Sequence, residues 1–230
     1  MVHIEFIGAA GSGKSAIHAE LMSEDFLYAG AAHYYDVSRK FRFPIDKFVK
    51  LAPSRIRKRI WLSYALNDLV EFFVKYPDVL CSIRKYGKEY EEDKIITNLF
   101  LKWCSIYIHN ERTKKEQEWN FMDEGFCQTG TSICFRSNIE CPPKSYLEAI
   151  PQPDILILVI SPPHLCQERQ MARKREQVYD TSIIELQQTA SKNIANWMEK
   201  RGTKVIKVKN NESIEYTVNN ILKELREYKM

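Results

Sequence analysis

The sequence has no long hydrophobic run and no strong excess of one charge. A helix that spans a membrane needs about 18 or more consecutive apolar residues, and no such stretch occurs among the 230 residues. The 34 Lys and Arg residues nearly balance the 30 Asp and Glu residues, which leaves a formal net charge of +4. We therefore expect no membrane partner, and the charge does not favour nucleic acid, although it suits a site for polyphosphates.

Cysteine occurs six times but never in a C-x-x-C pair. This spacing gives neither a zinc site nor a disulfide framework. The first apolar run begins at residue 2, which leaves no room for a signal peptide in front of it. We expect a reduced, cytoplasmic protein.

Internal repeats, low-complexity tracts and linkers are also missing, so we expect one domain over residues 1–230. The N-K-x-D motif of guanine-specific GTPases and the L-S-G-G-Q signature of ABC-type ATPases are both absent. The first absence weighs against a GTPase and the second against an ABC-type ATPase.

The clearest motif that is present lies in residues 2–15, VHIEFIGAAGSGKS. A short apolar run rich in β-branched and aromatic residues predicts a buried strand. Gly8, Gly13, Lys14 and Ser15 follow at the spacing G-x-x-x-x-G-K-[ST]. Glycines allow the backbone to turn its N–H groups toward an anion, and the next helix directs its positive end to the same place.

This motif predicts a nucleoside triphosphate site, with ATP and Mg²⁺ as the ligands. Lys14 is expected to be a partly exposed side chain that reaches the terminal phosphates, and the Ser15 hydroxyl to bind Mg²⁺. The residues expected to bind the nucleotide are Gly8, Ala9, Ala10, Gly11, Ser12, Gly13, Lys14, Ser15 and Ala16.

Strands and helices are expected to alternate along the chain. Predicted strands cover residues 2–7, 31–37, 119–125, 154–160 and 204–208, and helical periodicity dominates residues 43–118. Pro162 and Pro163 are placed to open a helix, Ser182 and Glu185 have capping-box spacing, and Gly202 would end the long helix that follows. The pattern predicts an α/β, three-layer P-loop NTPase fold with a doubly wound, parallel, five-stranded sheet.

Two carboxylates, Asp123 and Glu124, close the apolar run WNFM. An acidic residue at this place in a P-loop protein typically holds the Mg²⁺ shell, which is the role we expect for Asp123. Glu124 is a candidate general base toward an acceptor hydroxyl, or a residue that orients a water molecule. Asp36, at the end of the predicted second strand, is the other candidate base.

A basic segment, ERQMARKRE, follows the strand at 154–160. Arg169 and Arg173 are i, i+4 neighbours, and Arg175 adds charge. Arginines on a mobile lid, here about 163–180, would stabilise a phosphoryl group in transfer and exclude water. Without ligand we expect these arginines to be poorly ordered or turned outward.

The order GAAGSGKS, MDEG, ILILVISPPHLCQERQMARKRE and KVIKV resembles the thymidylate kinase and deoxynucleoside kinase group of P-loop kinases. The closest likeness is the lid pattern ERxxxRxRxxE, met by Glu168, Arg169, Arg173 and Arg175, while Glu176 falls one residue short. The likeness covers residues 1–25 and roughly the last 110, but not the helical middle.

The resemblance implies an acceptor cleft under those middle helices, and a base just past the second strand, where Asp36 lies. Members carry Asp-Arg where this chain has Asp123-Glu124, so an arginine that contacts the acceptor is missing.

These patterns predict an ATP-dependent kinase of a small-molecule hydroxyl or phosphate, with a nucleoside or nucleotide as the first guess for the acceptor. A sugar, an antibiotic or another metabolite alcohol is an alternative. A hydrolytic switch would explain the Asp123–Glu124 pair, and basic clusters at 39–42 and 55–59 leave open a kinase of nucleic-acid ends. A homodimer is compatible with the sequence.

Overall fold

The computed structural model describes residues 2–22, 66–82, 94–112, 119–173, 177–211 and 213–229. Its centre is a parallel sheet of four strands in the order β2-β1-β3-β4. The strands are β1 (Val2–Ile7), β2 (Trp119–Met122), β3 (Ile155–Ile160) and β4 (Lys204–Lys209). The described part of the sheet therefore has four strands, not five, because the expected strand at 31–37 lies outside the described residues.

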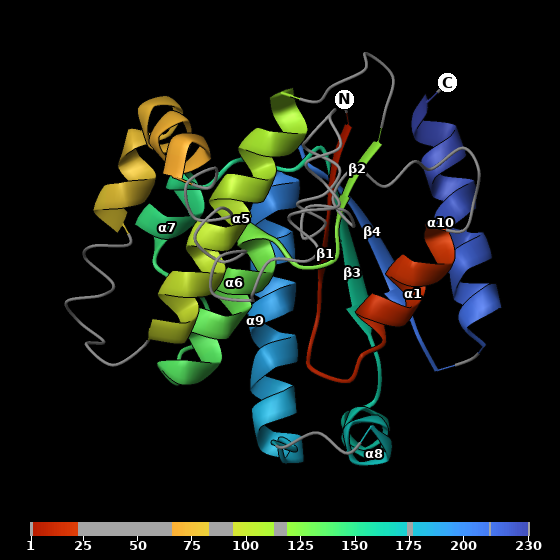
Figure 1. Cartoon of the computed structure of the whole chain (residues 1–230). Coiled ribbons are helices and arrows are strands. Elements are labelled where there is room, and N and C mark those ends of the chain that lie inside the picture. Colours follow the sequence, from red (N-terminus) through yellow and green to blue (C-terminus); the bar gives the residue numbers. More distant parts are fainter. Residues whose placement is uncertain are drawn as a thin grey trace, which may run out of the picture.

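Helices cover both faces of this sheet, as Figure 1 shows. On one face lie α1 (Lys14–Leu21) and α10 (Ile214–Lys229). On the other lie α5 (Lys94–Arg112), α6 (Phe126–Arg136), α7 (Lys144–Ala149) and α9 (Thr181–Lys200). The expected layers of an α/β fold with a parallel sheet are thus confirmed.

Side chains of β1 alternate between the two faces, because successive residues of a strand point in opposite directions. Ile4 and Phe6 pack with α1 and α10, whose buried residues include Val218, Ile221 and Leu225. Burial of each such side chain stabilises the fold by about 1.5–3 kcal/mol. Ile7 faces the other core, which is rich in aromatic rings from α5 and α6. Both faces of β1 are buried, so its carboxyl end is held firmly.

The carboxyl ends of the four strands lie at one edge of the sheet, since all strands are parallel. The loop after β1, the acidic residues after β2, and α8 (Pro163–Ala172) after β3 all begin there. Pro163 lies in the first turn of α8, as predicted from its fixed φ and missing N–H. This edge is where ligands bind in open α/β sheets.

Two helix ends show how local chemistry sets boundaries. The N-cap of α9 is Asp180, whose side chain accepts from the Ile183 N–H at 2.9 Å, and the Ser182 hydroxyl donates to the same carboxylate at 2.7 Å. The expected capping box led by Ser182 is therefore wrong. Gly202 does follow the end of α9, with a φ of 96° that favours glycine.

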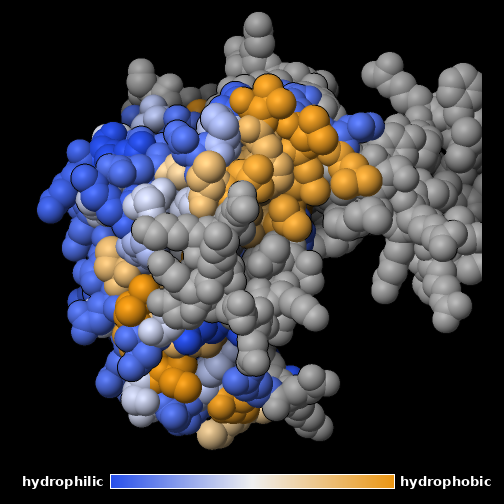
Figure 2. Space-filling model, turned by 90° about the vertical axis from the view of Figure 1, so that its left-hand side faces the viewer, coloured by the Kyte–Doolittle hydropathy of each residue, from blue (hydrophilic) through white to orange (hydrophobic). Residues whose placement is uncertain are grey.

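Helical residues 66–75 and 77–82 present an apolar surface. Figure 2 looks onto this side of the molecule and shows hydrophobic residues gathered there. Leu66, Val70 and Val74 are more than half exposed and follow each other at helical spacing. Across the described residues, no helix combines the length and the apolar character needed to span a membrane.

Candidate active site

The loop between β1 and α1 curls tightly against α8 and β4. Gly11 and Gly13 have φ values of 81° and 98°, which L side chains rarely adopt. A Cβ atom on Gly11 would overlap the carbonyl oxygen of Cys166, and one on Gly13 would overlap the side chain of Asn210. The glycines of the motif are thus required both for the turn and for the close approach of neighbouring elements.

One carbonyl oxygen of this loop, that of Ser12, accepts three hydrogen bonds from side chains outside the loop. It accepts from Asn210 Nδ2 at 2.7 Å, from Ser161 Oγ at 3.1 Å and from Arg169 Nη1 at 3.4 Å. Ser161 and Asn210 directly follow β3 and β4, so three neighbouring strands hold the loop in place.

Lys14 turns back into the loop. Its Nζ donates to the carbonyl oxygens of Gly8 at 2.7 Å and Ala9 at 3.0 Å, and the residue is only 7% exposed. The expectation of a partly exposed lysine is therefore wrong. The loop's own carbonyl groups thus hold the ammonium, while Ser15 is exposed at the start of α1.

A cavity of about 160 Å³ opens beside the loop. Its walls come from the loop, from the β2–α6 region, and from residues around the end of α8 and the start of α9. The lining residues include Gly11, Lys14, Glu124, Gln128, Arg173, Tyr179 and Gln187. The cavity thus brings together the predicted lysine, one predicted carboxylate and one predicted arginine.

The two predicted carboxylates face different surroundings. Glu124 lines the cavity together with Lys14 and Ser15. Asp123 is not among the lining residues. Its Oδ1 is buried, and within the described residues it has no hydrogen-bond partner. An exposed hydroxyl at Ser15 and an oxygen of Asp123 that is free to accept are the kinds of ligand that Mg²⁺ takes, so these residues fit the predicted ion.

His18 of α1 lies in the electrostatic field of Asp123. Burial lowers the pKa of His18 below its usual value, and the negative charge of Asp123 partly opposes this shift. The imidazole is thereby favoured in its neutral form. A neutral His18 contributes no positive charge next to Asp123.

The predicted arginines have different surroundings. Arg169 is half-buried, and besides Ser12 it donates to Ser161 Oγ and the Asn210 carbonyl, both at 3.1 Å. It is thus neither turned outward nor part of the cavity wall, contrary to the expectation. Arg173 is exposed at the end of α8 and lines the cavity. Arg175 and Asp36 lie outside the described residues.

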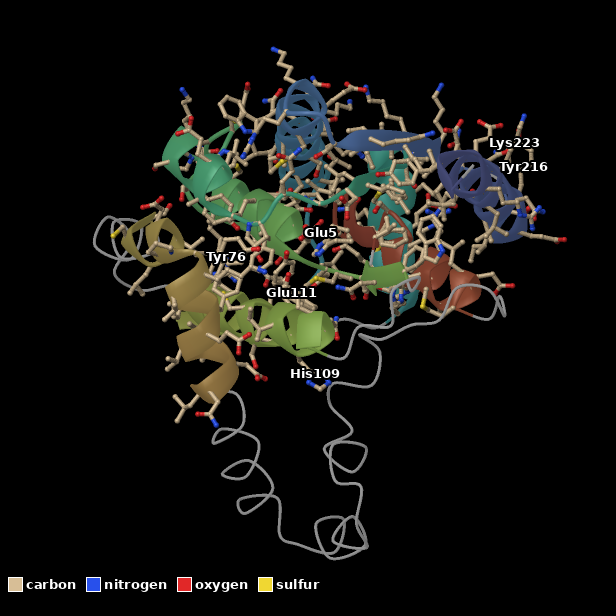
Figure 3. The ribbon with its side chains drawn as sticks, turned by 90° about the horizontal axis from the view of Figure 1, so that it is seen from above. Glu5, Tyr76, His109, Glu111, Tyr216 and Lys223 are labelled. Carbon is tan, nitrogen blue, oxygen red and sulfur yellow. The ribbon has the colours of Figure 1, made fainter. Side chains whose placement is uncertain are left out.

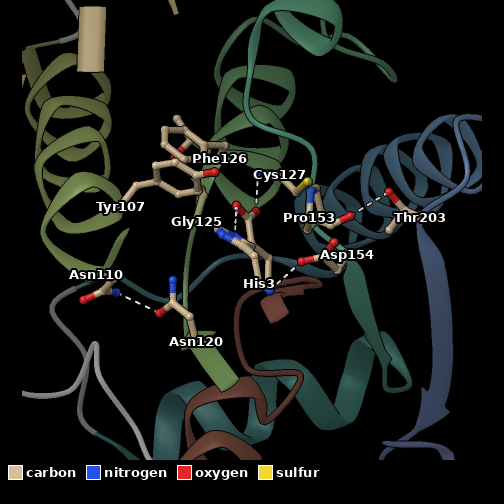
Figure 4. Close-up of polar contacts among 12 residues, drawn as sticks. His3, Tyr107, Asn110, Asn120, Gly125, Phe126, Cys127, Pro153, Asp154 and Thr203 are labelled. Atoms are coloured by element: carbon tan, nitrogen blue, oxygen red, sulfur yellow. Dashed lines mark hydrogen bonds and ion pairs between the residues drawn. The ribbon is translucent and has the colours of Figure 1, made fainter. Parts of the chain in front are cut away.

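A buried carboxylate that sequence reasoning missed, Glu5, supports the β2–α6 junction. Figure 3 places Glu5 in the interior of the molecule. Its Oε1 pairs with His3 Nε2 at 3.1 Å, and its Oε2 accepts from the Cys127 N–H at 2.8 Å, as drawn in Figure 4. Because Cys127 lies in the first turn of α6, the carboxylate satisfies a helix N-terminal N–H directly after Asp123 and Glu124.

Glutamines form a second group that the sequence did not reveal. The side-chain oxygens of Gln128 and Gln187 accept from the N–H groups of Gly8 at 3.1 Å and Ala10 at 2.8 Å. Both side chains come from helices far along the chain, α6 and α9. Nothing in the spacing of these glutamines predicts that they meet the loop, since only the packing of the helices brings them there.

No protein-family model and no curated protein sequence matches this chain. Among solved structures, it is similar to two of deoxyadenosine kinase from M. mycoides, one with bound dCTP and one with the products dCMP and a flexible dCDP. Each is 14% identical to this chain and covers 97% of it and 98% of its own chain, with TM-scores of 0.48 and 0.47.

Proposed function

We propose that this chain is an ATP-dependent phosphotransferase that acts on a small-molecule hydroxyl or phosphate. The observation that supports this most directly is the cavity wall, where Lys14 of the phosphate loop, Glu124 and Arg173 occur together. A donor phosphate, an acceptor and a stabilising cation are the parts that phosphoryl transfer needs at one place. The resemblance of the sequence pattern favours a nucleoside or nucleotide as the acceptor.

Each residue has a distinct proposed role. Lys14 leaves the carbonyl oxygens of Gly8 and Ala9 and neutralises the terminal phosphates. Glu124 accepts the proton of the acceptor hydroxyl from its position on the cavity wall. Arg173 stabilises the negative charge that develops on the transferred group. Ser15 and Asp123 would hold Mg²⁺, which would supply positive charge next to the phosphates.

Arg169 has a different part in this proposal. Its hydrogen bonds to Ser12, Ser161 and Asn210 fix α8 to the loop, so it shapes the phosphate site from below. The lid that we propose is correspondingly smaller than 163–180, because α8 itself belongs to the fixed part of the site. The whole chain, 1–230, would act as one kinase domain.

The second candidate is a P-loop ATPase that uses hydrolysis as a switch. The adjacent carboxylates Asp123 and Glu124 favour it, because Glu124 could orient a water molecule as well as an acceptor hydroxyl. The two functions differ in their product, which is free phosphate for the switch and a phosphorylated acceptor for the kinase.

Lys14→Ala tests the proposed function. We expect it to lower phosphoryl transfer from labelled ATP to nucleosides and nucleotides by about a hundredfold or more, the usual loss when one charge-stabilising donor is removed. The matched control is Lys204→Ala, whose ammonium pairs with Glu224 at 2.8 Å on the surface. Activity of Lys14→Ala within about threefold of the wild type would contradict the proposal. A tenfold change in rate corresponds to about 1.36 kcal/mol of activation free energy, so a threefold change would mean that Lys14 hardly stabilises the transition state.

A further inference from the structure

Two buried glutamines hold both polar groups of a single residue of the phosphate loop, Ala10. Gln187 of α9 accepts from the Ala10 N–H at 2.8 Å. Gln170 of α8 donates through Nε2 to the Ala10 carbonyl oxygen at 3.1 Å. Gln170 is 1% exposed and Gln187 is 4% exposed. A buried amide side chain that makes no hydrogen bond destabilises the fold, so the bonds of these two glutamines contribute to stability.

These two bonds fix the direction of the neighbouring peptide groups. A peptide is planar and trans, so its C=O and N–H point in opposite directions. Gln187 holds the Ala10 N–H, and the Ala9 carbonyl oxygen accordingly points inward, where it accepts from Lys14 Nζ at 3.0 Å. By the same geometry, the bond from Gln170 to the Ala10 oxygen directs the Gly11 N–H away from that side chain.

Gln170 also reaches beyond the loop. Its Oε1 accepts from the Tyr179 N–H at 3.1 Å, so one side chain joins Ala10 to Tyr179. The Tyr179 ring lines the cavity and meets Phe135 edge to face, with 5.4 Å between ring centres. A shift of the Ala10–Gly11 peptide would therefore be passed to the aromatic wall of the cavity through a single buried amide.

We propose that Gln170 is a positioning residue that aims the Gly11 N–H at the donor phosphates and couples this peptide to Tyr179 on the cavity wall. This inference rests on the proposed function, because it assumes a nucleoside triphosphate at the loop. Gln170 acts through Ala10 and Tyr179 and contacts neither substrate itself. Binding of phosphate to the loop would thus tighten the wall that faces the acceptor.

The chain supplies a matched control in Gln167, one turn earlier on α8. Its Nε2 donates to the Tyr179 carbonyl oxygen at 3.3 Å, and within the described residues its side chain makes no hydrogen bond to the loop. Gln170→Met and Gln167→Met each remove an amide that binds Tyr179 and keep a side chain of similar length. Only Gln170→Met also breaks the contact with Ala10, together with the bond from Nε2 to the Cys166 carbonyl oxygen of α8 at 3.2 Å. ATP affinity by calorimetry and hydrogen exchange at the Gly11 and Tyr179 amides are then measured with and without Mg²⁺ and ATP.

In the wild type, ATP is expected to slow exchange at Gly11 and Tyr179 together. Gln170→Met should weaken ATP binding about tenfold, the loss that a missing hydrogen-bonding group typically causes, and abolish the response at Tyr179. Gln167→Met should keep the response and lose less than about threefold in affinity. A structural role alone would lower stability in both variants without removing the ligand-dependent response.

The outcomes separate the two proposals. If the wild type does not bind ATP, the proposed function fails and this inference falls with it. If the wild type binds ATP but Gly11 and Tyr179 do not respond together, or if the two variants behave alike, only the inference is overturned.

If Gln170→Met does not fold, hydrogen exchange of the wild type still tests the inference, and Gln170→Glu provides a second variant. Its carboxylate keeps an acceptor for the Tyr179 N–H but cannot donate to Ala10, so ATP affinity should fall while Tyr179 stays protected in the free chain.

Discussion

Asp123 and Glu124 are consecutive in the chain but have different environments. Glu124 lines the cavity, whereas Asp123 keeps a buried oxygen that, within the described residues, has no hydrogen-bond partner. A buried acceptor without a partner is costly, by about 1–3 kcal/mol, unless a ligand satisfies it. A cation at Asp123 would remove this cost, which fits the proposed Mg²⁺ site.

We predict that Asp123→Asn raises the Mg²⁺ concentration needed for activity more than it weakens ATP binding without metal. The reason is that the carboxylate acts through the ion. Titration of ATP affinity with and without Mg²⁺ checks this. Glu124→Gln is the comparison, and it should depress turnover with little change in ATP affinity. An equal loss of affinity in both conditions for Asp123→Asn would mean that Asp123 is structural.

At the scale of elements, the junction of β2 and α6 depends on a side chain of β1. The Glu5 carboxylate binds the first turn of α6 and lies against Gly125, where a Cβ atom would overlap it. It also raises the pKa of the buried Cys127 thiol, after the larger effect of burial itself. β1 therefore carries both the phosphate loop and the anchor that sets the position of the acidic residues opposite it.

We predict that Glu5→Leu destabilises the fold by about 3–5 kcal/mol, because it leaves the Cys127 N–H and His3 Nε2 without their partner in the core. Glu5→Gln keeps an acceptor for the Cys127 N–H and should cost less. Urea unfolding measures both. The control is Asn120→Leu, which breaks the buried Asn110–Asn120 bond of 2.7 Å, also drawn in Figure 4, away from α6.

The Glu5 variants should also differ from that control in function. Glu5→Leu is expected to raise the Mg²⁺ requirement, since α6 and the acidic residues before it lose the anchor that fixes their position. Asn120→Leu should lower stability and leave that requirement unchanged. The same Mg²⁺ requirement in both variants would show that Glu5 serves only the stability of the core.

Much of this architecture could be predicted from the sequence, because period and turn chemistry are local signals. The apolar run ILILVI, the proline at the start of α8 and Gly202 after α9 all lie where expected. The capping box expected at Ser182 is wrong, because Asp180 caps α9 two residues earlier by accepting from the Ile183 N–H. A local sequence pattern does not show which of two neighbouring polar residues caps the helix.

The site could be predicted only in part, for a physical reason. Lys14, Glu124 and Arg173 are recognisable because their motifs are contiguous, and the structure brings them to one cavity. Gln128, Gln170 and Gln187 bind the loop through tertiary packing, and a glutamine on a helix gives no sequence signal of its own. The direction of Lys14 was also hidden, because it depends on the peptide orientation at Ala9.

At the scale of the whole molecule, the elements around the loop divide into a fixed and an exposed part. The fixed part includes α8, which Arg169 and Gln170 tie to the loop, and Cys166, whose backbone packs against Gly11. Arg173 lies where α8 ends and is exposed. Of the predicted lid arginines within the described residues, Arg173 is thus the one whose position allows it to approach a transferred phosphoryl group from the cavity.

This division gives a prediction that separates a kinase from a hydrolytic switch. Arg173→Ala should lower turnover much more than ATP affinity, because charge on the transferred group develops only in the transition state. It should also raise the ratio of free phosphate to phosphorylated product, since an incomplete wall admits water. The measurement follows ADP, free phosphate and phosphorylated acceptor together, with and without candidate acceptors. Arg169→Ala is the contrast, and we expect it to weaken ATP binding itself, because it loosens the loop. If free phosphate always equals ADP, whichever acceptor is supplied, the switch replaces the kinase as the function of this chain.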